Sequence, residues 1–254
     1  MDVFMFYFLL GVLQGVLEWL PVSSSGNLTL FLVSSSSLTF SEAVRISFFL
    51  HAGTMASVLL RFRSDFLTLL KDAVSFTRSS FLKFYVIATM ISALVGFPLY
   101  FFLQIEISTI VGSLLIAFFL LFTGIIIRVQ KTGLKVRGDA GGLDAIIVGI
   151  SQGVSVIPGI SRSGITIAAL LSRGINQKEA LHVSFLLSVP PVCGLLIIGF
   201  SGFQWIYLVS MLVSFTFSLF SMELLLKISQ TLDFSYFCFF MAFITILISI
   251  VQFL

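Results

Sequence analysis

The chain contains the same unusual segment twice. The first copy, GVLQGVLEWLPVSSSG, covers residues 11–26, and the second, GISQGVSVIPGISRSG, covers residues 149–164, at a constant offset of 138 positions. Each copy begins as an apolar helix, reaches a proline and continues as a Ser/Gly-rich loop, which a helix does not tolerate well. The duplication therefore predicts two broken helices, related by an internal repeat, in a chain that is otherwise apolar.

The composition excludes an ordinary soluble domain. Hydrophobic residues make up 58% of the 254 residues and charged residues only 10%, whereas soluble domains carry about 25% charged residues. Such a chain cannot cover itself with polar surface, so the predicted fold class is an all-α integral membrane protein. The lipid bilayer is the expected partner of its surface, and we expect no nucleic-acid partner.

Six apolar runs are long enough for transmembrane helices, whereas the arms on either side of each serine loop are too short. A span needs about 20 apolar residues. We therefore interpret residues 1–37 and 143–172 as re-entrant hairpins, whose irregular backbone has to lie inside protein or beside a wet cavity. The whole chain, 1–254, is interpreted as a single membrane domain, with repeat A at about 1–127 and repeat B at about 139–254. The six predicted spans are 41–61, 81–103, 109–127, 179–200, 204–227 and 232–254.

The basic residues give this arrangement an orientation. Cytoplasmic loops are enriched in Lys and Arg. With residues 62–80 in the cytoplasm, all of the 14 Lys and Arg residues except Arg45 and Arg162 fall on the cytoplasmic side. Both termini then lie outside, the hairpin of repeat A opens outward and that of repeat B opens to the cytoplasm. We expect a multi-pass protein of the cell membrane, and inverted repeats of broken helices predict a polar site near the membrane midplane.

Arg162 is the charge that most needs an explanation, because it lies in the second serine loop. A charge inside the membrane costs roughly 2.5–3.5 kcal/mol, so it requires a partner or a function. The planar guanidinium group matches the oxygens of a phosphate. Glu18, close to the first loop, could pair with Arg162 across the repeat axis. A purely structural ion pair that holds the hairpins together is the alternative.

Further polar residues lie beside these two charges. Gln14 and Glu18 are four positions apart, so they share a helix face, although Gln14 could instead hydrogen-bond to a neighbouring helix. Ser24 is a possible nucleophile that Glu18 could activate. The loop residues could form an anion site or simply satisfy the broken backbone. These phosphate-binding candidates are Gln14, Ser23, Ser25, Gly26, Asn27, Ser161, Ser163 and Gly164.

The two histidines, His51 and His182, lie inside predicted spans. A lone histidine on an apolar helix is more often a hydrogen-bonding core residue than a functional one, so His51 is only a secondary candidate. No cluster of His, Cys, Asp or Glu has the spacing of a metal site.

The two broken segments resemble the signatures of a known family. Residues 11–26 resemble the first signature of the undecaprenyl-pyrophosphate phosphatase family of the bacitracin-resistance BacA/UppP type. That signature is Glu/Gln-x-x-x-Glu followed by Pro-x-Ser-Ser-Ser/Thr-Gly-His. PGISRSG at 158–164 resembles the second signature, and LHAGT at 50–54 resembles a segment between them. The resemblance extends over nearly the whole chain.

This resemblance implies a membrane phosphatase that converts undecaprenyl (polyprenyl) pyrophosphate to the monophosphate at the outer face and so recycles a lipid carrier. It implies that Gln14 and Glu18 form the Glu/Gln motif, that Ser24 is the nucleophile and that Arg162 binds phosphate. It also implies a divalent cation, Mg²⁺ or Ca²⁺, for which Glu18 is the candidate ligand, and a homodimer is compatible with it.

One position departs from the family pattern and keeps alternatives open. Asn27 stands where the family has histidine, and asparagine can hydrogen-bond to phosphate but cannot carry a proton at neutral pH. The alternative function is therefore a polyprenyl-phosphate flippase or transporter on the same inverted-repeat scaffold, with weak or no hydrolysis. An ion-coupled transporter of small solutes that uses Glu18 is a third interpretation, which the basic serine loop disfavours.

Overall fold

The computed structural model describes residues 2–20, 23–35, 38–77, 79–102, 109–129, 134–157, 160–198, 205–228 and 234–253. Within these ranges the chain is helical, with one isolated bridge between Lys135 and Ile175. The predicted all-α class is therefore confirmed.

The first six helices are α1 (Val3–Leu17), α2 (Ser24–Ser35), α3 (Phe40–Arg61), α4 (Arg63–Val74), α5 (Ser80–Phe102) and α6 (Thr109–Val129). After the short 3-10 turn η1 (Arg137–Asp139) come α7 (Gly142–Val154), α8 (Arg162–Ser172), α9 (Gln177–Leu187), α10 (Val189–Ile198), α11 (Trp205–Ile228) and α12 (Phe234–Phe253).

Each copy of the repeated segment is a broken helix, as its sequence predicts. α1 ends at Leu17 and α2 begins at Ser24, while α7 ends at Val154 and α8 begins at Arg162. Ser23 has a φ of 54°, a left-handed conformation that is uncommon for a residue other than glycine and turns the chain sharply before α2. The prolines in the two breaks, at positions 21 and 158, lie outside the described residues.

Four stretches among the described residues are long and apolar enough to cross a membrane: Glu42–Arg61, Ser80–Phe101, Gln177–Ile198 and Trp205–Ile228. The third is interrupted at Ser188, because α9 ends at Leu187 and α10 begins at Val189, just before Pro190 and Pro191. α6 and α12 cover the other two predicted spans, but many of their side chains lie outside the described part of the chain. The count of six spans therefore stays a prediction.

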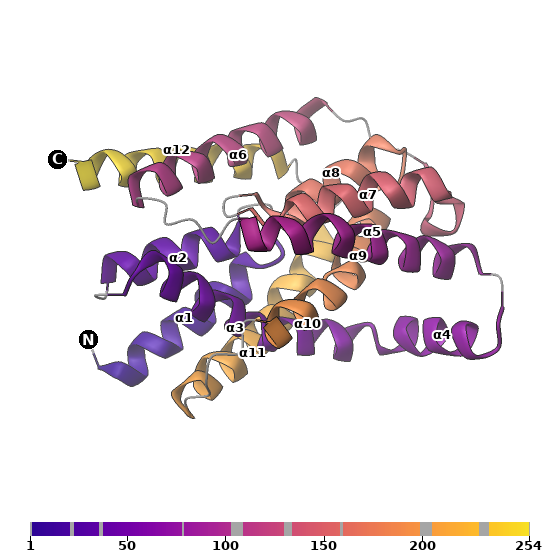
Figure 1. Ribbon diagram of the computed structural model, residues 1–254, viewed down its shortest axis with the longest axis horizontal. Helices are drawn as coiled ribbons and strands as arrows, with labels where there is room; N and C mark the ends of the chain where they lie inside the picture. The colour runs from indigo at the N-terminus through magenta and orange to yellow at the C-terminus, as the bar shows by residue number, and fades with distance from the viewer. Residues whose placement is uncertain are drawn as a thin grey trace.

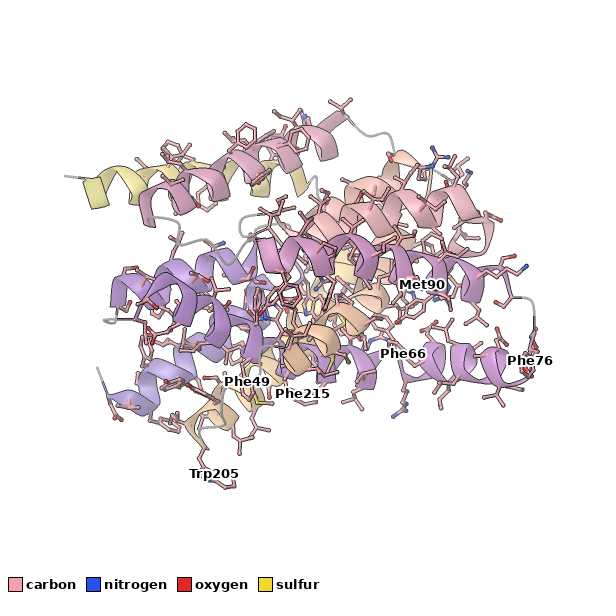
Figure 2. All side chains as sticks on the ribbon, viewed as in Figure 1. Phe49, Phe66, Phe76, Met90, Trp205 and Phe215 are labelled. Atoms are coloured by element: carbon pink, nitrogen blue, oxygen red, sulfur yellow. The ribbon has the colours of Figure 1, made fainter. Side chains whose placement is uncertain are left out.

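Large apolar side chains cover the surface of the bundle. Met90 is 66% exposed, Trp205 79% and Phe76 92%, and Figure 2 shows Trp205 and Phe76 pointing away from the bundle at different ends of the molecule. Exposed apolar surface on this scale is unusual for a monomeric soluble protein. It supports the assignment of the chain as a membrane protein.

The first helix of each repeat packs against a helix of the other repeat. α1 packs along α11, and α7 packs along α5. A Cβ atom added at Gly15 would lie 2.7 Å from the carbonyl oxygen of Ser214, and one added at Gly153 would lie 2.9 Å from that of Ser92. The Gly-x-x-x-Gly pairs that both copies share thus permit close helix contact, as small residues do in membrane proteins. Each broken helix is consequently held by a helix of the other repeat.

The two copies of the broken helix enter the molecule from opposite ends. α1 and α2 lie toward the end of the molecule that holds both chain termini, whereas α7 and α8 lie toward the end that holds α4 (Figure 1). α6 and α12 lie side by side along one edge. The two breaks therefore approach each other near the middle of the molecule.

Candidate active site

The carboxylate of Glu18 is at the centre of a buried polar cluster. Glu18 is 5% exposed. Its Oε1 forms an ion pair with Nη2 of Arg162, which comes from the other repeat. Its Oε2 accepts hydrogen bonds from Nε2 of Gln14 at 3.0 Å and from Oγ of Ser24 at 2.6 Å. Nε2 of His51 lies 3.0 Å from the same oxygen. Four elements therefore bring polar side chains to one carboxylate.

Local structure at the first break explains how Glu18 meets Ser24. Glu18 is the C-cap of α1, one turn after Gln14, so the two side chains share a face as their spacing predicts. The left-handed turn at Ser23 then directs the chain back, and Ser24 opens α2. A hydroxyl that donates to a buried carboxylate is the arrangement of a nucleophile beside its base.

Arg162 is held in place by three kinds of contact. It is the first residue of α8, behind an N-cap at Ser161. Its Nη1 donates to the carbonyl oxygen of Ser184 at 3.3 Å, and its guanidinium carbon lies 5.7 Å from the centre of the Trp19 ring. Trp19 is almost fully buried, and its Nε1 donates to Ser218. A charge, a carbonyl oxygen and an aromatic face together compensate the burial of the guanidinium group.

The same backbone position of each repeat contacts one nitrogen-bearing side chain of the cluster. Ser47 and Ser184 are equivalent in the Glu-Ala-x-x-x-Ser-Phe pattern of the two repeats. The carbonyl oxygen of Ser47 lies 2.7 Å from Nδ1 of His51, and that of Ser184 accepts from Arg162. The repeats thus share a backbone support, while the supported side chain differs.

A cavity of about 210 Å³ opens beside this cluster. Its polar part includes Glu18, Ser24, His51 and Arg162, and further serines from both loops line it: Ser23, Ser25, Ser161 and Ser163. Its apolar part comes from α5 and α10 and includes Phe97, Tyr100, Pro190, Pro191, Leu195 and Ile198. The cavity therefore presents both a polar end with charges and a wall suited to a hydrocarbon chain.

Four of the phosphate-binding candidates do not line the cavity: Gln14, Gly26, Asn27 and Gly164. Gln14 acts on Glu18 instead. The side chain of Asn27 donates to the carbonyl oxygen of Ser23 at 3.1 Å, and the N–H of Gly164 donates to Oγ of Ser161 at 3.1 Å. Direct contact of these four residues with phosphate stays a prediction without structural support.

Three polar atoms in the lining are buried and have no hydrogen-bond partner among the described residues: Oγ of Ser23, Oγ1 of Thr89 and Oε1 of Gln152. Nε2 of Gln152 donates to Ser92 on α5 at 3.2 Å. Leaving such a group unpaired costs about 1–3 kcal/mol, so these atoms are candidate hydrogen-bond partners for a polar ligand. The sequence does not single out Thr89 or Ser92; the only signal was Gln152, the repeat partner of Gln14.

The comparison with known families fits this site. Residues 7–247 match the model of the family described as Bacitracin resistance protein BacA. The chain belongs to this family. Three similar relatives are each called undecaprenyl-diphosphatase. The relative from Methanothrix thermoacetophila is 36% identical over 249 residues, which are 93% of each chain. The relative from Methanopyrus kandleri is 37% identical over 255 residues, 94% of each chain. The relative from Methanococcoides burtonii is 36% identical over 244 residues, 91% of this chain and 92% of the relative.

The divalent cation that the resemblance implies finds few ligands in this BacA-family protein. Among the described residues no group of three or more His, Cys, Asp or Glu could hold a metal ion. Glu18, the expected ligand, already contacts Arg162 through one oxygen and three other side chains through the second. The described residues therefore do not fit a protein-held Mg²⁺ or Ca²⁺ ion, and the cation stays a prediction.

Proposed function

We propose that this BacA-family protein is an undecaprenyl-diphosphatase, a membrane enzyme that hydrolyses polyprenyl pyrophosphate to the monophosphate and inorganic phosphate. The observation that carries the proposal is the Ser24–Glu18 hydrogen bond of 2.6 Å, which pairs a nucleophile with a base beside Arg162. The relatives described above are called undecaprenyl-diphosphatase, which supports the same substrate.

The pyrophosphate group binds at the polar end of the cavity. Arg162 offers a planar pair of donors to phosphate oxygens. The N-termini of α2 and α8 begin at Ser24 and Arg162, so the first N–H groups and the partial positive charge of both helices lie at this end. The polar atoms without partners at Ser23 and Gln152 give the second phosphate or its water further hydrogen bonds.

Substrate binding also prepares the base. Without substrate, Arg162 is paired with Oε1 of Glu18. A phosphate that takes over the guanidinium group leaves the carboxylate with less positive charge beside it, so Glu18 becomes a better proton acceptor when substrate is present. In this proposal the Glu18–Arg162 ion pair takes part in the reaction and is not purely structural.

In the chemical step, Oγ of Ser24, or a water molecule in its place, attacks the terminal phosphorus. Its proton passes to Oε2 of Glu18, and the bond between that phosphorus and the bridging oxygen breaks. The electron pair leaves with the polyprenyl monophosphate, and Arg162 stabilises the charge on the phosphoryl oxygens. Water then releases phosphate from Ser24 in the serine version of the reaction.

The isoprenoid tail lies along the apolar wall of the cavity. Phe97 and Tyr100 on α5, and Leu195 and Ile198 on α10, form this wall. Phe97 is also 55% exposed, so the wall continues onto the outer surface of the bundle. A long hydrocarbon chain can therefore leave the cavity toward lipid while its headgroup stays at Glu18.

The proposed architecture places six spans and two re-entrant hairpins in the cell membrane. The opposite directions of α1–α2 and α7–α8 support the inverted repeat (Figure 1). The basic residues near α4 and η1 support a cytoplasmic position for that end, with both termini outside and the hairpin of repeat A open outward. A homodimer stays a prediction.

The test is phosphate release from polyprenyl pyrophosphate by the purified protein in detergent. Release is expected from the wild type and should fall at least about 100-fold in Ser24→Ala and in Arg162→Ala, since removal of one stabilising group at such sites costs that much. Full activity in Arg162→Ala would overturn the proposal. Binding and translocation of the lipid without phosphate release would favour the flippase, the alternative that the inverted repeat and Asn27 support.

A further inference from the structure

A second group of polar side chains lines the cavity, on the side formed by α5 and α7. Thr89 and Ser92 come from α5, and Gln152 comes from α7. Gln152 is 2% exposed and Ser92 is 5% exposed. Nε2 of Gln152 donates to Oγ of Ser92 at 3.2 Å, so these two side chains hold each other in place. The three residues form a neutral subsite, since none of them is charged.

The neutral subsite contains polar atoms that await a ligand. Oγ1 of Thr89 and Oε1 of Gln152 are buried and have no hydrogen-bond partner among the described residues. The hydroxyl of Thr89 can donate as well as accept. The hydroxyl of Ser92 can do so too, so the amide of Gln152 can turn over, accept from Ser92 and present its NH₂ group to a ligand. The subsite can therefore donate to phosphate oxygens and still keep its internal hydrogen bond.

The face of α5 that lines the cavity changes from polar to apolar along the helix. Four residues of this face follow one another at spacings of three or four positions: Thr89, Ser92, Gly96 and Tyr100. The rise of an α-helix makes the face about 16 Å long from Thr89 to Tyr100. Phe97 lines the cavity at the apolar end, beside Tyr100 in this part of the helix. A ligand that lies along this face has to be polar near Thr89 and apolar near Tyr100.

The charges of the cavity lie elsewhere in its lining. Arg162, at the first position of α8, is the cation that faces Glu18. The described lining residues of α5 and α7 carry no charge at neutral pH. Hydrogen bonds between charged groups are the stronger ones. A single phosphate therefore binds at Arg162, and the neutral subsite adds hydrogen bonds to a second phosphate that is attached to the first.

We propose that the neutral subsite holds the phosphate that carries the prenyl chain, and that it makes the enzyme select pyrophosphates over monophosphates. The proposal rests on the phosphatase function proposed above, in which the terminal phosphate lies at Arg162. From the neutral subsite the prenyl chain continues along α5, past Gly96, which has no side chain, to Phe97.

A prenyl monophosphate cannot fill both places. With its one phosphate at Arg162, the first carbon atoms of its chain lie against Thr89 and Gln152 and leave their polar atoms unpaired. A site built to hydrogen-bond a group strongly rejects a ligand that lacks this group, for this reason. The monophosphate product is therefore a poor ligand for a second round, and hydrolysis stops at the monophosphate.

The experiment measures the binding of two unreactive analogues to the purified protein in detergent by calorimetry. A prenyl methylenebisphosphonate has two phosphorus groups, and a prenyl phosphonate with the same chain has one. The wild type should bind the first at least about tenfold more tightly. Gln152→Met replaces the amide by an apolar group of similar size. The Kd of the bisphosphonate should then rise at least about tenfold, whereas the Kd of the phosphonate should stay constant or fall.

A second variant makes the same test without the loss of an internal contact. Thr89→Val removes a hydroxyl that has no hydrogen-bond partner among the described residues, and it should narrow the ratio of the two Kd values at least about threefold. The matched control is Gln177→Met, because Gln177 begins α9 and is not part of the described cavity lining. Its ratio should equal that of the wild type.

An equal rise of both Kd values in Gln152→Met and Thr89→Val would indicate general damage to the cavity and would overturn the neutral subsite. A ratio that neither variant changes would overturn it as well. Phosphate release from polyprenyl pyrophosphate is measured in parallel. A wild type that releases no phosphate would overturn the phosphatase function, while the ratio of the Kd values would still decide for or against the neutral subsite.

Discussion

Glu18 and Arg162 are 144 positions apart and belong to opposite copies of the repeat, yet they form an ion pair beside the central cavity. Glu18 has no acidic counterpart in the second copy, where Val156 takes its place, and Arg162 corresponds to Ser24 in the first. Each copy therefore supplies one charge, and the site exists only where the two breaks meet.

Removal of one partner of this pair should destabilise the protein more than removal of both. Glu18→Gln or Arg162→Met alone leaves an uncompensated buried charge, so each is expected to lower the free energy of unfolding by about 3–5 kcal/mol. The double variant should lose less than the worse single variant. Unfolding in detergent, followed by circular dichroism against denaturant, measures all four proteins. Losses that simply add would show that the pair is not coupled.

The glycines at the α1–α11 and α7–α5 contacts should tolerate no side chain. A Cβ at Gly15 would lie 2.7 Å from the carbonyl oxygen of Ser214, so Gly15→Ala forces α1 away from α11 and should cost about 1–3 kcal/mol. Gly153→Ala should act likewise on α7 and α5. The matched control is Gly142→Ala, where nothing lies within 4 Å. The three variants can be ranked by thermal unfolding in detergent, and equal midpoints would contradict the close packing.

Restoration of the family histidine at position 27 should change little. The side chain of Asn27 does not line the cavity and donates to the carbonyl oxygen of Ser23. Asn27→His is therefore expected to change the maximal rate of phosphate release by less than about threefold, because a proton carrier at this position does not reach Glu18. A rise of more than tenfold in the rate assay would show that position 27 reaches the substrate.

Replacement of Thr89 by valine should stabilise the protein and weaken substrate binding. Its Oγ1 is buried in the cavity wall and has no hydrogen-bond partner among the described residues. Thr89→Val removes that unpaired group at nearly constant volume, so the free energy of unfolding should rise by about 1 kcal/mol. The KM for polyprenyl pyrophosphate should rise several-fold, because the ligand loses a hydrogen bond.

Unfolding curves and KM values for Thr89→Val and Thr216→Val provide the comparison for this prediction. Thr216 is exposed on α11, and its hydroxyl is bonded to the backbone of Leu212. Thr216→Val should therefore leave KM unchanged. A lower KM in Thr89→Val would mean that the orphaned hydroxyl does not face the ligand.

The class of the protein and the positions of its breaks could be predicted from the residues alone. Composition excludes a soluble domain, and Pro, Ser and Gly interrupt two apolar helices at matching places, because such effects act within a few residues of the chain. Spacing also predicted the shared face of Gln14 and Glu18, and the position of Arg162 in a membrane hairpin predicted that its charge needs a partner or a function.

Which side chains meet depends instead on how the helices pack in three dimensions. His51 looked like an ordinary residue of an apolar helix, but α3 brings it to Glu18. Asn27 looked like part of the phosphate site, but its side chain bonds to the backbone of Ser23. Neither outcome can be read from spacing, because contacts between helices depend on where the helices cross. Two of those crossings, of α1 with α11 and of α7 with α5, are close at Gly15 and Gly153, and through them each repeat holds the broken helix of the other.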